Sequence, residues 1–138
     1  MKIAYPILLA ALLGLTACST TKTDSKKGAP DKPETVMVIY HVKVGAEGEF
    51  LTVMGAAWEL YRKEHMVFDQ PHVVVRDLES GGQSRITEIF TWVNHEAPNK
   101  APDSVKAVWE KEHTLCESRY GKGAIEGGEV ELLLPKNK

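Results

Sequence analysis

Four side chains that could donate or accept protons lie in segments that are otherwise apolar. They are one glutamate and three histidines: Glu88, His41, His65 and His113. A carboxyl or imidazole group whose pKa is moved by burial can act as a general base. The sequence therefore nominates these four residues as candidate catalytic groups. The alternative is that His41 and Glu88 are hydrogen-bonded residues of a dimer interface, because polar groups among apolar neighbours need partners when buried.

Large aromatic side chains accompany these polar groups. A pocket with aromatic walls and few polar groups suits a small apolar ligand. The residues that could form such walls are Trp58, Tyr61, Phe90, Trp92 and Trp109. The alternative is that the tryptophans are ordinary core residues whose indole N–H groups are paired.

Sequence patterns that hold common metals and cofactors are absent. The five histidines include no i, i+4 pair with a glutamate between them, and the two cysteines do not form a Cys-x-x-Cys pair. Zinc sites usually require such spacings. A nucleotide-binding glycine loop, a Cys-x-x-Cys-His haem site and a Gly-x-Ser-x-Gly elbow are also missing. We therefore expect no metal and no cofactor.

Composition excludes further classes of protein. The chain has 17 basic against 19 acidic residues, and 43% of its 138 residues are hydrophobic. These values are typical of a globular domain and unlike those of a disordered or collagen-like chain. A nucleic-acid-binding domain usually carries a basic excess, which this chain lacks, so we expect no nucleic acid partner.

The first eighteen residues have the features of an export signal. A basic start precedes an apolar run over residues 3–15, which is too short to span a bilayer. Residues 15–18 read Leu-Thr-Ala-Cys and resemble the lipobox of bacterial lipoproteins, whose cysteine is acylated after cleavage. The resemblance implies a signal peptide over residues 1–17 and a lipid anchor on Cys18, and Ser19 favours the outer membrane, facing the periplasm. An ordinary signal peptide with an incidental Cys18 is the alternative.

Residues 18–34 predict a lipidated start followed by a flexible tether. Beyond Cys18 this segment has no apolar side chain larger than alanine, and its charges nearly cancel. Such a segment cannot bury enough surface to offset the entropy of ordering it. We therefore expect the folded domain at residues 35–134, with a short tail at residues 135–138.

β-Branched and aromatic residues predict four strands in this domain. The strands are expected at residues 35–44, 72–78, 85–93 and 129–134, and the Gly-Gly at residues 81–82 predicts a hairpin between the second and the third.

Two helices are expected between these strands. Apolar residues at the 3.6 period predict the first over residues 47–65. The second is expected to be capped by Asp103 or Ser104 and stopped by Gly121 and Gly123. One face of the second helix carries Val105, Val108, Trp109, Glu112, Leu115 and Cys116. The βαββαβ order predicts a ferredoxin-like α+β fold, with both helices on one face of a four-stranded antiparallel sheet.

Both faces of the expected sheet are apolar. On the first strand, Met37 and Ile39 alternate with Val38 and Tyr40, and the third strand shows the same pattern. A sheet with one solvated face should alternate apolar with polar residues. We therefore expect the helix-free face to be covered by a second copy of the chain in a homodimer. The alternative cover is the chain's own tail or tether.

Three segments carry a family resemblance. Residues 44–50 (VGAEGEF), 88–97 (EIFTWVNHEA) and 105–109 (VKAVW) resemble the dimeric α+β barrel superfamily, in particular its antibiotic-biosynthesis-monooxygenase-like members. The resemblance implies a pocket between the helices and the sheet of each protomer. Members include cofactor-independent monooxygenases and haem-degrading enzymes. The latter use an asparagine on the first strand, which this chain lacks.

The sequence leaves three functions open. The first is a cell-envelope lipoprotein whose domain binds a small apolar ligand or an envelope partner. The second is a cofactor-independent monooxygenase that acts on an aromatic substrate between Trp58 and Trp92, with His41, His65 or His113 as the base. The third is a structural envelope module with a filled core and no pocket.

Overall fold

The computed structural model describes residues 32–133. The signal peptide, Cys18, most of the tether and the tail at residues 135–138 lie outside them, so the predictions for those segments stay predictions. The described elements follow the order β1 (Glu34–His41), α1 (Glu47–Lys63), β2 (Val67–Leu78), β3 (Ser84–Trp92), α2 (Asp103–Thr114) and β4 (Ile125–Glu129).

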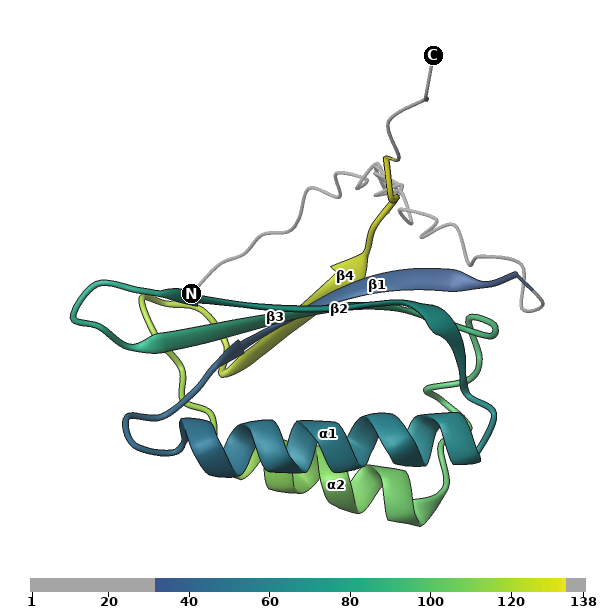
Figure 1. Cartoon of the computed structure of the whole chain (residues 1–138), viewed down its shortest axis with the longest axis horizontal. Coiled ribbons are helices and arrows are strands. Elements are labelled where there is room, and N and C mark those ends of the chain that lie inside the picture. The colour runs from purple at the N-terminus through teal and green to yellow at the C-terminus, as the bar shows by residue number, and fades with distance from the viewer. Residues whose placement is uncertain (1–31, 134–138) are drawn as a thin grey trace, which may run out of the picture.

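The four strands form one antiparallel sheet in the order β2-β3-β1-β4. Figure 1 shows α1 and α2 together beneath one face of this sheet. Right-handed crossovers bring both helices to the same face. The ferredoxin-like fold and its helix placement are therefore as predicted. In the part of the chain from residue 32 to residue 133, no helix has the length and apolar character needed to cross a membrane.

The bounds of three strands differ from the sequence-based prediction. β1 ends at His41 rather than at residue 44. β2 begins at Val67 rather than at residue 72, because residues around Pro71 stay in the strand across a shift of register. β2 lies at the edge of the sheet, where a proline removes no ladder hydrogen bond. β4 covers Ile125–Glu129 rather than residues 129–134, because Gly127 and Gly128 pair with β1 instead of ending the loop before the strand.

The helix ends also differ from the prediction. Neither Asp103 nor Ser104 caps α2; Pro102 precedes the helix in an extended conformation without a side-chain cap. Asp103 instead lies in the first turn, where its negative charge interacts favourably with the positive end of the helix dipole. α2 ends at Thr114, well before Gly121. α1 ends at Lys63, and His65 follows it with a positive φ of 54°.

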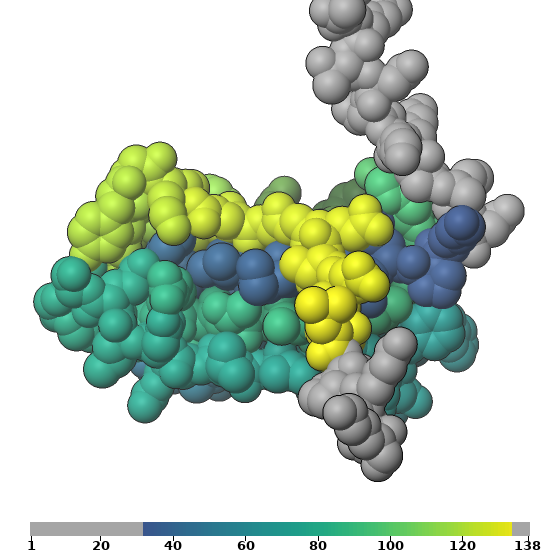
Figure 2. Space-filling model, turned by 90° about the horizontal axis from the view of Figure 1, so that it is seen from above, coloured from purple at the N-terminus to yellow at the C-terminus, as the bar shows by residue number. Residues whose placement is uncertain are grey.

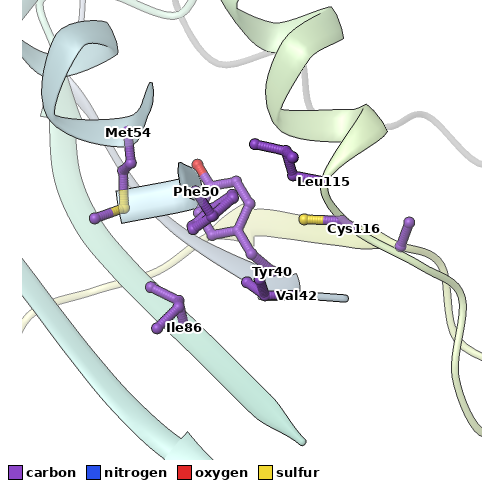
Figure 3. Close-up of a cluster of buried hydrophobic side chains, with 8 residues drawn as sticks. Tyr40, Val42, Phe50, Met54, Ile86, Leu115 and Cys116 are labelled. Carbon is purple, nitrogen blue, oxygen red and sulfur yellow. The ribbon is translucent and has the colours of Figure 1, made fainter. Parts of the chain in front are cut away.

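Buried side chains fill the space between the helices and the sheet in two groups. The first surrounds Tyr40, whose ring lies 4.9 Å from that of Phe50, centroid to centroid. Figure 3 shows Tyr40 in the middle of this group, with Phe50 and Met54 reaching it from α1. The second group is rich in aromatic rings and includes Tyr61 and Trp92. These rings form the site described below.

The opposite face of the sheet, called the helix-free face below, carries apolar side chains from three strands. Cross-strand partners lie on the same side of a sheet. By the observed register this face includes Met37, Ile39, Val73, Val75 and Ile89. Val73 and Val75 on β2 are 43% and 52% exposed.

The end of the chain covers part of the helix-free face. The backbone N–H of Val130 donates to the carbonyl oxygen of Thr35 at 2.9 Å. Figure 2 shows the segment that follows, in yellow, crossing over the middle of the sheet. The exposed valines of β2 show that this cover is incomplete.

Candidate functional site

A cavity of about 300 Å³ lies between the sheet and the helices. Its wall is formed by residues of β1, β3, β4, α1 and α2. β1 and β3 are the central strands of the sheet, and their inward side chains face the two helices. The lining residues are Val38, Tyr40, Tyr61, Phe90, Trp92, Trp109, Glu112, His113 and Ile125. His113 is the exposed member of this set, which places it where the cavity meets solvent.

Aromatic rings in contact with one another form most of the wall. The ring of Trp92 lies 4.7 Å from that of Phe90 and 5.4 Å from that of Tyr61, measured between centroids. The indole N–H of Trp109 donates to the hydroxyl of Tyr61 at 2.5 Å. Each such ring pair contributes about 0.5–1.5 kcal/mol beyond the area it buries. The wall is therefore held in place before any ligand arrives.

Glu112 brings a carboxyl group into this apolar wall. It lies three residues after Trp109 on α2, so the two side chains share one face of the helix. Glu112 is 2% exposed, and its Oε1 has no hydrogen-bond partner among the described residues. Burial, with a smaller effect from the charge of Glu88, raises the pKa of Glu112 to about 8. A buried polar atom without a partner costs about 1–3 kcal/mol, so a ligand in the cavity that reached this carboxyl group could remove that cost.

Glu88 forms a hydrogen-bonded chain beside the cavity. The hydroxyl of Tyr40 donates to Glu88 Oε2 at 3.1 Å, and His72 Nε2 lies 2.8 Å from Glu88 Oε1. Burial raises the pKa of Glu88, although the hydrogen bonds from His72 and Tyr40 act in the opposite direction. The ring of His72 stacks on Trp58 at 3.6 Å. Because Tyr40 lines the cavity and the His72 side chain is 21% exposed, these hydrogen bonds connect the cavity wall with the protein surface.

The structure separates the four catalytic candidates. His113 lines the cavity, and Glu88 reaches it through Tyr40. His41 is buried beneath the helix-free face, where its Nδ1 lies 3.1 Å from Glu79 Oε2. His65 is exposed after the end of α1 and does not line this cavity.

The aromatic candidates are brought together more completely. Tyr61, Phe90, Trp92 and Trp109 line the cavity. Trp58 lies outside it, stacked on His72 at a separate surface depression.

Three polar residues of the site were not among the candidates: Glu112, Tyr40 and His72. A signal for Glu112 was present in the sequence, since a glutamate on the apolar face of a helix is unusual unless it has a role there. No signal marked His72, because its partner Glu88 comes from the neighbouring strand.

Within residues 32–133, no group of three or more histidine, cysteine, aspartate or glutamate side chains is arranged to hold a metal ion.

Comparison with protein-family models and with curated proteins gives no match. Solved structures do resemble this domain. SnoaB, a cofactor-independent oxygenase from Streptomyces nogalater, matches with a TM-score of 0.57 and 16% identity over 78% of this chain and 99% of its own. A conserved protein from Methanosarcina mazei gives a TM-score of 0.56 and 16% identity, over 73% and 93% of the two chains. A putative antibiotic biosynthesis monooxygenase from Bacteroides thetaiotaomicron gives 0.55 and 12%, over 80% and 98%. At these identities the likeness establishes a shared fold.

Proposed function

We propose that the domain binds a small, largely apolar molecule with an aromatic ring in the cavity between α2 and the sheet. The observation that carries this proposal is an aromatic wall that includes one buried carboxyl group, that of Glu112, whose Oε1 has no hydrogen-bond partner among the described residues. A domain under selection for stability alone would fill or pair this space, since cavities and unpaired buried groups both destabilise a fold. The filled structural module is therefore the interpretation that the geometry favours least.

The volume of the cavity limits the size of the ligand. A dry cavity of about 150 Å³ is large enough for benzene. The cavity of about 300 Å³ in this domain is thus suited to a molecule with one or two rings.

Filling the cavity is expected to abolish binding. Ile125 lines the cavity from β4, and Ile125→Trp would place an indole in it. We expect calorimetric titration with 2-phenylethanol or 1-naphthol to give saturable binding to the wild-type domain and at least tenfold weaker binding to this variant. Leu51→Trp is the matched control, because Leu51 is 40% exposed on α1 and lies away from the cavity. Equal binding by Ile125→Trp and wild type would place the ligand elsewhere.

A second candidate function is cofactor-independent oxygenation of an aromatic substrate. The observation that favours it is a carboxyl group with a pKa of about 8 on the cavity wall, because such a group can serve as a general base near neutral pH. Glu112, with His113 beside it, would take a proton from a phenol or enol, and the resulting anion could react with O2. Substrate-dependent oxygen uptake that Glu112→Gln abolishes would favour this function over binding alone.

We also propose that two copies of the domain pack through their helix-free faces. The support is the apolar character of that face and the exposure of its β2 edge. A face that pairs with itself generates a closed, symmetric dimer.

Export and lipid attachment at Cys18 are proposed on the sequence alone. We expect the full-length chain, expressed in a Gram-negative host, to incorporate labelled palmitate and to sediment with outer membranes. The Cys18→Ala variant should lose the label entirely. Cys116→Ala is the matched control, because Cys116 is the other cysteine and is buried in the domain. Labelling of Cys18→Ala would refute the anchor.

A further inference from the structure

The cavity presents an unusual pairing of aromatic faces with acidic groups, and the pairing indicates the charge of the ligand. We infer that the ligand carries an amine, and that its ammonium group lies against the carboxylate of Glu112 while its apolar part packs on the aromatic wall. This inference rests on the proposed function, since it names the chemical class that the same cavity would select.

The carboxyl group of Glu112 is the first feature that favours an amine. Its Oε1 is buried and has no partner in the described part of the chain, and Glu112 is one of the residues that line a cavity large enough for a ligand. An ammonium group carries three N–H donors and no acceptor. Charge-assisted hydrogen bonds of this kind are roughly twice as strong as neutral ones. An amine would therefore satisfy this oxygen better than a neutral donor would.

The aromatic rings of the cavity wall are the second feature that favours an amine. The π-faces of tryptophan and tyrosine attract cations within about 6 Å, most strongly where water is excluded. Tyr61, Trp92 and Trp109 all line the cavity and contact one another. No lysine or arginine is among the lining residues, and His113 is the single basic side chain there.

A second carboxyl group strengthens the preference for a cation. Glu88 lies close enough for its charge to act on Glu112, and its Oε2 accepts the hydrogen bond from Tyr40 on the cavity wall. Both carboxyl groups therefore act on a ligand in the same sense.

A competing chemistry uses the protonated form of Glu112. A neutral carboxyl group could donate its proton to a ligand carbonyl or hydroxyl oxygen. Such a ligand would use one hydrogen bond, with no cation–π attraction to the ring faces and no charge attraction to Glu88. The arrangement as a whole therefore favours the amine.

The test compares three ligands of similar shape: 2-phenylethylamine, 2-phenylethanol and phenylacetate. Titrations are run at about pH 8.5, where an alkylamine with a pKa near 10 is still positive. We expect the amine to bind at least tenfold more tightly than the alcohol, and the acid to bind most weakly. Glu112→Gln should lower the affinity for the amine to that for the alcohol, while the affinity for the alcohol changes less than threefold. Glu110→Gln, an exposed position on the same helix, should leave all three affinities unchanged.

The outcomes separate this inference from the proposed function. If the alcohol binds as tightly as the amine or more tightly, the inference is wrong while ligand binding in the cavity stands. If Glu112→Gln keeps the preference for the amine, the inference is also wrong, because a group other than Glu112 then binds the ammonium group. If none of the three ligands binds, the proposed function fails and the inference fails with it.

Discussion

Replacing Glu112 by glutamine is expected to stabilise the domain at alkaline pH and to reduce the dependence of its stability on pH. The carboxyl group titrates at about 8 in the folded domain and at 4.5 in an ordinary environment. Between these two values the unfolded chain has lost the proton and the folded chain keeps it, so raising the pH favours unfolding. One pKa unit corresponds to about 1.4 kcal/mol. Glu112 should therefore lower the free energy of unfolding by on the order of 3–5 kcal/mol between pH 5 and pH 9.

Glutamine has the same shape and does not ionise. The free energy of unfolding of the variant should therefore not fall with pH for this reason. The other titratable groups that face Glu112 do not reproduce the effect. Burial raises the pKa of Tyr40, Tyr61 and Cys116 further above their already alkaline ordinary values, so they stay neutral in this range. Glu88 shifts in the same direction as Glu112 and remains in the variant, so part of the slope should persist.

Urea denaturation at a series of pH values measures this effect. The two proteins should have similar stability near pH 5, and the stability of the variant relative to the wild type should increase steadily toward pH 9. Glu110→Gln on the exposed side of α2 serves as the control and should follow the wild type. Parallel curves for Glu112→Gln and wild type would mean that Glu112 ionises as freely in the folded domain as in the unfolded chain.

A single lysine on the helix-free face is expected to convert a dimer into monomers. Val75 lies on that face of β2 and is 52% exposed, so Val75→Lys should cost the isolated domain little. In the proposed dimer the ammonium group would be buried without a partner, which is strongly destabilising. We expect the dissociation constant of the dimer to rise at least a hundredfold.

The neighbouring residue provides a matched control for this experiment. Val74 lies on the same strand and is 39% exposed, but it pairs with Glu88 and so belongs to the opposite face. Light scattering across a concentration series should show Val74→Lys as dimeric as the wild type and Val75→Lys as a monomer. A wild-type domain that is monomeric at micromolar concentration would refute the dimer. The segment after β4, residues 130–133, would then be the main cover of this face.

The fold could be predicted because its signals are local. β-Branched residues around Val38, the 3.6 period of α1 and the Gly-Gly hairpin at residues 81–82 each identify an element without knowledge of its neighbours. β4 was misplaced because Gly127 and Gly128 read as a loop. Their role in the sheet depends on pairing with β1, which is a tertiary interaction.

The candidate site could be predicted in part for the same reason. The alternation along β1 places His41 on the face opposite Tyr40, and the structure agrees. Both faces of β1 are apolar in sequence, so the alternation does not show which face the helices cover. The structure, in which Tyr40 faces the helices, places His41 away from the pocket. Trp58 shares the apolar stripe of α1 with Tyr61, yet it lies at the margin beside His72, and that depends on where the helix sits on the sheet.

The claim that an aromatic ligand occupies this cavity can be tested most directly with the three tryptophans, which report from two different places. Trp92 and Trp109 line the cavity, and Trp58 does not. In a two-dimensional NMR spectrum of the nitrogen-15-labelled domain, each contributes one indole N–H signal, assigned by single Trp→Phe variants. On titration with whichever of 2-phenylethylamine and 2-phenylethanol binds more tightly, the signals of Trp92 and Trp109 should shift saturably, with Trp58 much less affected. Saturation with no shift at Trp92 and Trp109, or a shift confined to Trp58, would contradict the assignment of this cavity as the binding site.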